Sequence, residues 1–523
     1  MKAPDKQILE IVDIQAIEPD LVFLALLPRA MAEKTQTLAF GGDDDHIYVL
    51  TTNNFPTLYH QTIDKLQALG YSCSPYYTDT AGIQHALGRY DRLEKQEKDQ
   101  VEQYQYAHHV GGEEAIALIK KAYKQKDTLN EGAFIDEILR LSYQAGASDV
   151  HFQAEEMGIF MRLRKDGVLH TIIMFTHQEF QKYLMKLKYI AGTKMNIIDI
   201  NQDGRFDFVA ERDGQKNKID VRVSVMPGLR GESMVLRFLD PNKGIMSLED
   251  LGVQPHNVAI IKEKLSRTVG LILVTWPTGS GKTTSVYSML NMINAPDKKI
   301  ITLEDPVEYE LPGIEQSQIN EKKWYTFEEG LKWILRHDPD IIMVGEIRSY
   351  ESAQMAINAA LTWHLVISTL HTNSAAEAIP RLINMGVKPF MLAAALSLVI
   401  AQRLVRKVAH AEQKPAPRSV DTAIKAVLQR IHKAHPHMEL PYDGTIPVPI
   451  QGDKASDDGY AGRVAVMETL NIDETIKHAI MENMPTDQLL DLALKQGYLT
   501  MEDDAYLKLI AGVTSIEEIK RVL

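Results

Sequence analysis

Hydrophobic and polar positions follow three different patterns in the first half of the chain. Between residues 21 and 87, the alternating segment HIYVLTT predicts a strand, and FPTLYHQTIDKLQALG has the spacing of an amphipathic helix. Residues 88–125 are charged and rich in glutamine, which predicts a partly helical linker. From Glu131 a helical pattern leads into four alternating segments, DVHFQAE, GIFMRLRKDG, KIDVRVSVMPG and SMVLRFLD, which predict a sheet-bearing domain.

The pattern changes again near Leu251. Four short strand patterns, LILVTW, IITLEDP, DIIMVGE and LVISTL, are each followed by a helical pattern. Strands of this buried kind alternate with helices in proteins that contain a parallel sheet. Beyond Arg406 the chain is polar and contains several prolines, and helical patterns then continue to Leu523. The chain is therefore predicted to be an α/β protein with several domains.

Composition narrows the class of protein. At roughly 100–200 residues per domain, the length predicts three to five domains. Acidic residues outnumber basic ones by 70 to 57, and the net charge of −13 argues against extensive nucleic-acid binding. The longest apolar stretch, Phe390–Ala401, is shorter than the about 20 residues that a membrane-spanning helix needs. No signal-peptide pattern is present, and the single cysteine, Cys73, excludes an internal disulfide. A soluble, cytoplasmic protein is expected.

One segment has the features of a phosphate-binding site. A buried strand pattern is followed by Trp276 and then by Pro277, Thr278, Gly279, Ser280, Gly281, Lys282, Thr283 and Thr284, where a helix begins. Glycines let backbone N–H groups approach a phosphate, and the start of the helix adds partial positive charge. Lys282 can reach the β- and γ-phosphates, and the hydroxyl of Thr283 can join the shell of a Mg²⁺ ion. A turn without a ligand is the alternative, and the run Gly-Ser-Gly-Lys-Thr-Thr argues against it.

Acidic and histidine residues follow the neighbouring strands. Glu304 and Asp305 end one strand pattern, Glu346 ends the next, and His371 ends a third, while His364 comes just before that third strand. Ligands of open α/β sheets bind at the carboxyl ends of the strands. A carboxylate at the position of Glu346 can polarise an attacking water and help to hold Mg²⁺. A lone histidine is more often an ordinary core residue, but this shared position favours a role at the site.

Several motifs follow one another in order between residues 131 and 523. They are ASDVHF, RLRKDGVL, DVRVSVMPG, GESMVLR, LEDPVEY, ILRHDPDIIMVGEIR, ALTWHLVISTLHTN and GYAGR. This series resembles the secretion ATPases of type II secretion and type IV pilus assembly. The resemblance implies an α/β fold with a RecA-like P-loop NTPase core, a PAS-like sheet domain before it, a small α/β N-terminal domain and a helical C-terminal region. The expected segments are 1–90 for the N-terminal interaction domain, 91–130 for the charged linker, 131–242 for the sheet domain, 243–408 for the ATPase domain and 409–523 for the C-terminal region.

The resemblance also implies roles for individual residues. Nucleotide would lie between the RecA-like domain and the sheet domain, with ATP and Mg²⁺ as cofactors. Lys282 and Thr283 would hold phosphate and Mg²⁺, Glu304 and Glu346 would serve the metal and the water, and His371 would sense the γ-phosphate. The other expected nucleotide-binding residues are Pro277, Thr278, Gly279, Ser280, Gly281, Thr284, Asp305, His364, Arg205, Arg222 and Arg237. For the three arginines, ordinary pairing on the surface of the strands is the alternative.

The family works as a homo-hexamer on an inner-membrane platform protein of a pilus or secretion system. The resemblance therefore implies a motor at the cytoplasmic face of the membrane that acts through protein partners and does not bind nucleic acid. The segment LLPRAMAEKTQTLAF resembles an extra N-terminal domain that retraction motors lack, which favours an assembly or export motor. Two other functions stay open: a nucleotide-binding scaffold with weak catalysis, and a DNA-translocating or DNA-uptake motor.

The chain departs from the family pattern in its metal-binding residues. Many members carry two Cys-x-x-Cys pairs that bind zinc, after LVRK and before GYAGR, and this chain has no cysteine there. No structural zinc is therefore predicted. The histidines of this region are expected on the solvated surface: His410, His432, His435 and His437. Ser349 also stands where the family usually has an acid, with little consequence expected.

The four tryptophans form the second departure. Trp276 stands where the phosphate-loop motif has its first glycine, and Trp363 stands where the family reads Thr-Gly-His. Trp324 falls where glycine is common, and Trp333 is less clear. Three interpretations stay open. The tryptophans are ordinary and tolerated, or the phosphate loop is degenerate and inactive. In the third, the native residues are glycines: some bacteria read the codon UGA as glycine, and a translation that reads UGA as tryptophan places tryptophan at these positions.

Overall fold

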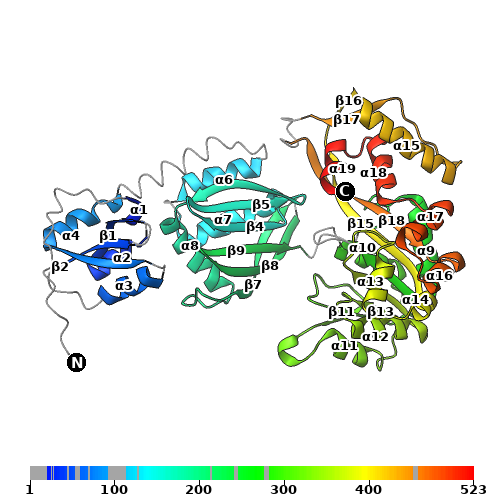
Figure 1. Cartoon of the computed structure of the whole chain (residues 1–523), viewed down its shortest axis with the longest axis horizontal. Helices are drawn as coiled ribbons and strands as arrows, with labels where there is room; N and C mark the ends of the chain where they lie inside the picture. The colour runs from blue at the N-terminus through cyan, green and yellow to red at the C-terminus, as the bar shows by residue number, and fades with distance from the viewer. Residues whose placement is uncertain are drawn as a thin grey trace.

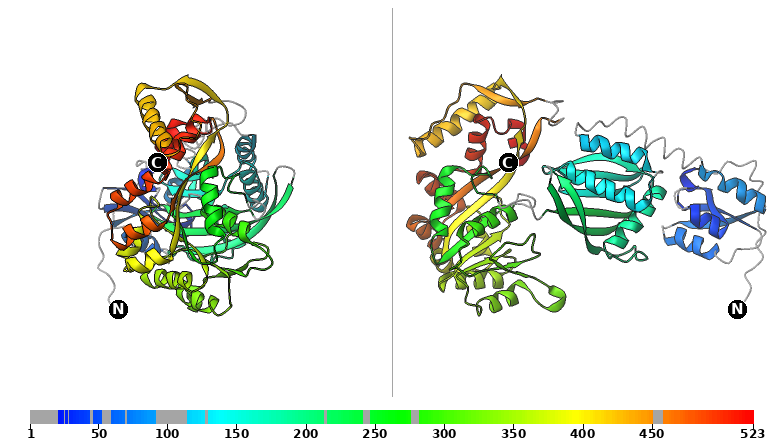
Figure 2. Two further views of the ribbon diagram at one scale, coloured as in Figure 1. Left: turned by 90° about the vertical axis from the view of Figure 1, so that its right-hand side faces the viewer. Right: turned by 180° about the vertical axis from the view of Figure 1, so that it is seen from behind.

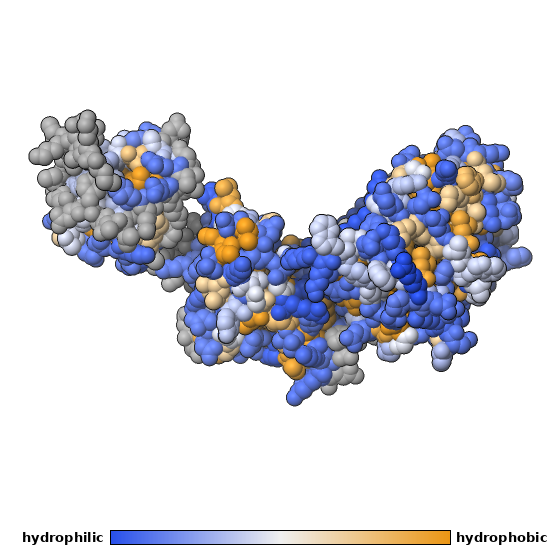
Figure 3. All heavy atoms as spheres, turned by 90° about the horizontal axis from the view of Figure 1, so that it is seen from below, coloured by the Kyte–Doolittle hydropathy of each residue, from blue (hydrophilic) through white to orange (hydrophobic). Residues whose placement is uncertain are grey.

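The computed structural model describes residues 21–24, 26–27, 29–43, 46–52, 59–68, 71–91, 114–126, 129–212, 215–240, 246–275, 282–450 and 458–523. These residues form three parts that follow one another along the longest axis (Figure 1), and the view from behind shows the same order (Figure 2). We call them the N-terminal unit (21–91), the sheet domain (114–240) and the C-terminal part (246–523). Each has its own sheet and its own buried hydrophobic cluster. The face seen from below is mostly hydrophilic, with smaller hydrophobic areas (Figure 3).

The N-terminal unit is a three-stranded sheet with short helices. In chain order its elements are α1 (Leu21–Leu24), α2 (Arg29–Thr35), β1 (Thr37–Gly42), β2 (His46–Thr52), α3 (Tyr59–Ala68), β3 (Ser72–Thr78) and α4 (Thr80–Leu87). Strand β2 lies in the middle, antiparallel to β1 and parallel to β3. The buried hydroxyl of Tyr90 donates to the carbonyls of Leu24 and Leu27, which fixes the end of the unit to its beginning.

The sheet domain is a six-stranded antiparallel sheet packed against helices. Its elements are α6 (Glu114–Lys124), α7 (Glu131–Gln144), β4 (Asp149–Glu155), β5 (Gly158–Lys165), β6 (Val168–Phe175), α8 (His177–Ile190), β7 (Gln202–Arg212), β8 (Gln215–Gly228) and β9 (Gly231–Leu239). The strand order is β6-β5-β4-β9-β8-β7. Helix α7 begins where Asn130 accepts the amide of Ala133, and Phe134, Ile138 and Leu141 recur on its buried face.

The first half of the C-terminal part alternates strands and helices. Its elements are α9 (Pro255–Leu265), β10 (Gly270–Thr275), α10 (Lys282–Ile293), β11 (Ile300–Glu304), β12 (Glu315–Gln318), the 3₁₀ helix η2 (Glu321–Lys323), α11 (Phe327–Ile334), β13 (Ile341–Val344), α12 (Tyr350–Leu361), β14 (Leu365–Leu370), α13 (Ala378–Asn384), α14 (Pro389–Ala395) and β15 (Leu396–Val408). Every residue of β10, β11, β13 and β14 is buried, as expected for parallel strands covered on both faces.

The second half adds helices and one long strand. Its elements are β16 (Ala411–Pro415), α15 (Arg418–Ala434), β17 (Thr445–Pro449), β18 (Tyr460–Asn471), α16 (Glu474–Met481), α17 (Thr486–Lys495), α18 (Met501–Ile510) and α19 (Ile516–Val522). Strand β18 pairs antiparallel with β15 and completes a seven-stranded sheet in the order β12-β11-β13-β14-β10-β15-β18. The region expected to be helical therefore also supplies an edge strand to the sheet of the preceding segment.

Two sequence expectations about this half can be compared with the structure. His410, His432 and His437 are exposed, but His435 is half-buried, with its ring 4.7 Å from that of His256 and its Nε2 2.8 Å from the carbonyl oxygen of Gly497. The surface expectation is thus wrong for His435, because the end of α15 packs on the rest of the C-terminal part.

No helix among the described residues is both long enough and apolar enough to cross a membrane.

Candidate functional site

The parallel strands of the C-terminal part end at one edge of their sheet. Thr275, the last residue of β10, pairs in register with Leu370, the last residue of β14. Val344 at the end of β13 pairs with Leu303 of β11 and with Ser368 of β14. The residues that follow these strands therefore meet at the same edge, which is where ligands of open α/β sheets bind.

The predicted phosphate loop connects this edge to helix α10. Trp276, Pro277, Thr278, Gly279, Ser280 and Gly281 lie outside the described residues. Helix α10 begins at Lys282, directly after the loop, and the structure describes the backbone but not the side chains of Lys282 and Thr283. Thr284 is half-buried, and its carbonyl oxygen accepts the hydroxyl of Ser288. Strand β10 and helix α10 therefore flank the motif as predicted from the sequence.

Four ionisable side chains meet at the strand ends, and we call them the charge cluster: Asp305, Glu346, Arg348 and His371. Nε2 of His371 lies 3.3 Å from Oε2 of Glu346, and the guanidinium of Arg348 pairs with the other oxygen of Glu346. The same guanidinium lies 3.6 Å from Asp305. The hydrogen bond from Arg348 to Glu346 raises the pKa of the arginine, so its positive charge is permanent. Glu346 is largely buried, whereas His371 is half exposed.

Glu304, the last residue of β11, contacts a different set of residues. Its buried carboxylate accepts hydrogen bonds from the hydroxyls of Tyr287 and Thr302 and from Nε2 of Gln316, the last two at 2.5 and 3.1 Å. Burial, and then the charge of Glu304, raise the pKa of Tyr287. These donors come from α10, β11 and β12, so Glu304 joins three elements and any direct contact with a metal would require some of these bonds to be released.

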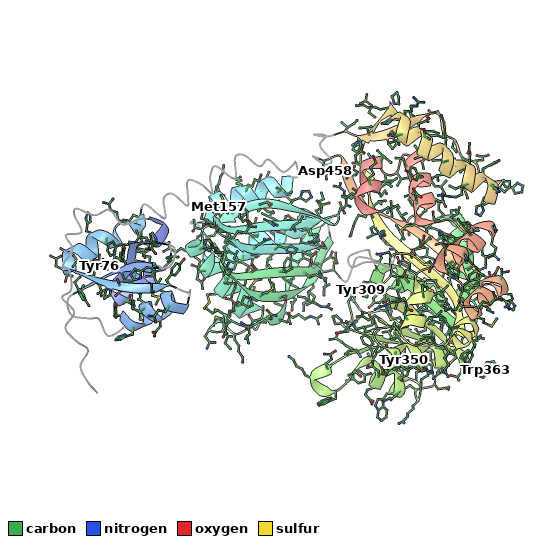
Figure 4. The ribbon with its side chains drawn as sticks, in the orientation of Figure 1. Tyr76, Met157, Tyr309, Tyr350, Trp363 and Asp458 are labelled. Carbon is green, nitrogen blue, oxygen red and sulfur yellow. The ribbon has the colours of Figure 1, made fainter. Side chains whose placement is uncertain are left out.

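Burial also acts on Tyr309, whose ring lies 4.6 Å from that of Tyr287. Burial first, and then the charges of Glu304 and Glu308, raise the pKa of Tyr309 to about 12, so its phenol stays neutral. Figure 4 labels Tyr309 on the side of the C-terminal part that faces the sheet domain. The segment after β11 therefore carries the neutral Tyr309 and the charged Glu308 towards that domain.

The three expected arginines form a row across the sheet domain. Arg205 of β7 pairs in register with Arg222 of β8, which pairs with Arg237 of β9. Arg205 donates to Asp220 at 2.7 Å and Arg237 to Asp149 at 2.8 Å. Arg222 instead crosses to the C-terminal part: it donates to the carbonyl of Val307 at 2.7 Å and lies 3.4 Å from Glu308. The three arginines therefore lie side by side on neighbouring strands, and Arg222 reaches the segment that follows β11.

His364 is the expected site residue that the structure keeps apart. It precedes β14, whereas His371 follows it, so the six residues of the strand separate the two histidines by about 20 Å. Nδ1 of His364 contacts the carbonyl of Ala359 at the end of α12. This placement gives His364 a structural contact at the opposite edge of the sheet.

Sequence reasoning did not single out three residues of the site, Arg348, Tyr287 and Gln316. Arg348 lies two residues after Glu346, and Tyr287 lies five residues after Lys282 on the helix that follows the phosphate loop. A cation near two predicted acids, and a phenol one turn from a phosphate loop, are the signals that could have identified the first two. Gln316 has no such signal, because its contact with Glu304 depends on how β12 pairs with β11.

Known proteins resemble the chain over most of its length. Residues 124–521 match the family model described as type II/IV secretion system protein, and residues 9–97 match the MshEN domain. The type IV pilus assembly ATPase PilB of Thermus thermophilus is 38% identical over 74% of the chain, which spans only 42% of that relative. The type II secretion system protein E of Dickeya dadantii is 40% identical, and the match covers 74% of each chain.

Solved structures agree with these matches. The crystal structure of the pilus retraction motor PilT with bound ADP is 26% identical, with a TM-score of 0.50 over 74% of this chain and 96% of that one. The Legionella pneumophila ATPase DotB, at 23% identity, has a TM-score of 0.52 over 74% of this chain and 95% of its own, which supports the fold alone. The family model covers well over half of the residues, and the chain therefore belongs to the type II/IV secretion system protein family.

Proposed function

We propose that the chain is a Mg²⁺-dependent ATPase that works as a homo-hexameric motor for type IV pilus assembly or type II secretion. The charge cluster supports this most directly, since a largely buried carboxylate and a histidine follow strands that end at the same edge of the sheet as β10, the strand before the phosphate-loop motif. The family membership and the names of the relatives support nucleotide binding and hydrolysis. The expected segments 1–90, 91–130, 131–242, 243–408 and 409–523 are part of this proposal.

In the proposed mechanism the residues divide the work. Residues 277–284 cradle the phosphates, with Lys282 on the β/γ oxygens. Thr283 and the acidic residues would hold Mg²⁺ through oxygen atoms, the ligands that this ion prefers, and the bound ion would neutralise phosphate charge. Glu346 orients the attacking water and takes its proton, while His371, 3.3 Å from Glu346, contacts the γ-phosphate. Glu304 holds the metal side of the site in place through its bonds to α10 and β12.

We propose that the arginines of the row contact the phosphates of the nucleotide, and that a platform protein is the partner of the motor. Arg205 and Arg237 keep acidic partners within the chain. A nucleotide between the domains would offer these arginines a stronger anionic partner, because bidentate arginine–phosphate pairs are strong. We propose that the motor acts at the inner face of the membrane on a polytopic platform protein.

The decisive experiment measures ATP hydrolysis by purified full-length protein with and without Mg²⁺. Glu346→Gln should retain ATP binding and lose turnover by about 100-fold or more, because general-base catalysis contributes about 10²–10⁴-fold. The exposed acid Glu351, in the first turn of α12, provides the matched control, and Glu351→Gln should hydrolyse ATP at the parent rate.

Each assay is repeated in protein that also carries Trp276→Gly. The comparison distinguishes a protein whose phosphate loop is weakened by Trp276 from a protein that has no ATPase activity. Turnover of Glu346→Gln equal to that of the parent would remove the assigned role. Failure of both forms to hydrolyse ATP would favour the scaffold, and stimulation by DNA that declines over a salt series would favour a translocase.

A further inference from the structure

Two of the three tryptophans within the described residues have a backbone conformation that favours glycine. Trp324 has φ of 59° and Trp363 has φ of 71°. Within the described residues, the other non-glycine positions with positive φ are Gln36, Asp166, Asp338 and Asn483. Asp and Asn tolerate this region because their short polar side chains bond locally, whereas a bulky side chain there is an outlier. The two tryptophans are therefore strained in a way that the other positions, mostly Asp and Asn, are not.

Both strained tryptophans end a helix. Trp363 follows Thr362, the C-cap of α12, and so occupies the position after the cap where glycine commonly closes a helix. Trp324 closes η2, and its amide donates to Glu321 at 3.0 Å. A glycine adopts the left-handed conformation at either place without a clash, since it has no Cβ.

Neither indole compensates for its strain by packing. The side chains of Trp324 and Trp363 are 85% and 84% exposed, and Figure 4 labels Trp363 at the outer edge of the C-terminal part. Tryptophan normally contributes by burying a large ring. Trp333 is also 54% exposed, on α11, where the guanidinium of Arg336 lies 5.0 Å from its ring. All three described tryptophans thus project into solvent.

The fourth tryptophan stands at a position defined by chemistry. Trp276 directly follows β10 and precedes Gly281 by five residues, which is the spacing of the first glycine in the phosphate-loop motif. Backbone N–H groups can surround a phosphate only where the turn is tight, and a glycine permits that turn. One residue type thus occupies two left-handed helix ends and the first position of the phosphate loop.

We propose that glycine occupies positions 276, 324, 333 and 363 of the native protein, because its gene specifies them with UGA codons that the host reads as glycine. A single codon assignment accounts for the three positions that favour glycine and extends to position 333, whereas separate substitutions would need three coincidences. The native phosphate-binding site then has the complete motif Gly-Pro-Thr-Gly-Ser-Gly-Lys-Thr. The consequence for the loop rests on the proposed ATPase function, but the identity of the residues does not.

The gene provides the first test. UGA codons at the four positions, and peptides of the protein from the source organism with the mass of glycine there, are expected. UGG codons at positions 324 and 363 would overturn the proposal and leave the proposed ATPase function standing.

Purified full-length variants provide the second test. Trp324→Gly and Trp363→Gly should each raise the melting temperature by about 2–4 °C, since they relieve a strained φ. Trp333→Gly is the control: it removes a half-exposed indole from within α11, where φ is not positive, and should lower the melting temperature, because glycine weakens a helix. A lowered melting temperature for all three variants would contradict the backbone argument.

ATP binding separates this proposal from the proposed function. The Trp276→Gly variant should bind Mg²⁺–ATP at least about tenfold more tightly than the protein with tryptophan at position 276, as measured by calorimetry. UGA codons combined with no ATP binding by this variant would confirm the residue assignment and overturn the ATPase. Equal affinity with UGG codons would overturn the assignment alone.

Discussion

At the scale of single residues, two neighbours at the end of β11 serve different parts of the site. Asp305 faces Arg348 of the charge cluster, while Glu304 is buried against Tyr287, Thr302 and Gln316. A buried carboxylate is costly unless hydrogen bonds satisfy it, so these three donors make the position of Glu304 well defined. Because Tyr287 belongs to α10, the helix after the phosphate loop, a shift of that helix would also displace Glu304.

This contact leads to a prediction for Tyr287→Phe. Loss of the hydroxyl removes the bond between α10 and Glu304 without leaving a large cavity, and we expect kcat to fall about tenfold, equivalent to ~1.4 kcal/mol, with KM nearly unchanged. Steady-state ATPase kinetics of the full chain would measure both. Tyr325→Phe is the control, because that hydroxyl also makes a partly buried bond, to Ser317 at 2.6 Å, without touching Glu304. Equal kinetics for the two variants would show that Tyr287 does not position Glu304.

At the scale of elements, the sequence predicted what local pattern determines. The parallel strands were predicted because their apolar runs are short and lead directly to the polar residues Glu304, Glu346 and His371. Strand β18 was assigned to a helical region, although its pairing with β15 completes the sheet, because that pairing joins residues far apart in sequence. The contact of Gln316 with Glu304 could not be predicted either, because it depends on how β12 pairs with β11.

The last helix shows how such long-range contacts stabilise the C-terminal part. Glu518 of α19 accepts the amide and the guanidinium of Arg406 on β15 and also pairs with Arg521. Burial alone would raise the pKa of Glu518, but the hydrogen bonds from Arg521 and Arg406 lower it to about 2. Since this pKa is depressed on folding, the stabilisation is present above the ordinary value near 4.5 and is lost as the pH falls towards 2.

We therefore predict that Glu518→Gln lowers the melting temperature at pH 7 and changes its dependence on pH. Between pH 5 and pH 2 the parent should lose stability more steeply than the variant, because only the parent has this carboxylate to protonate. Thermal unfolding followed by circular dichroism over this pH range measures the effect. Glu517→Gln, which changes the exposed neighbouring acid, should follow the parent curve. Parallel curves for Glu518→Gln and the parent would contradict the assignment.

At the scale of the whole molecule, polar contacts join the sheet domain to the C-terminal part. Arg222 reaches Val307 and Glu308 beside the strand-end site. At a second point, Asp166 in the turn after β5 accepts the amide of Gly462 at 3.0 Å and lies 3.7 Å from Nε of Arg463. Such partly exposed contacts contribute about 0–1 kcal/mol each and are weakened by salt. Contacts of this strength can exchange, which suits the domain movements of the proposed motor.

The last prediction concerns this junction. Raising the salt concentration should loosen it, so the radius of gyration of the full chain, measured by small-angle X-ray scattering, should increase between about 0.05 and 0.5 M salt, as screening shortens from roughly 14 to 4 Å. The double variant Asp166→Asn/Arg222→Gln should already be expanded at low salt and respond little to more, and asparagine suits the left-handed backbone at position 166, where φ is 47°. Lys218→Gln, which breaks an exposed ion pair with Asp207 inside the sheet domain, is the control and should behave like the parent. A double variant as compact and as salt-sensitive as the parent would mean that other contacts hold the two parts together.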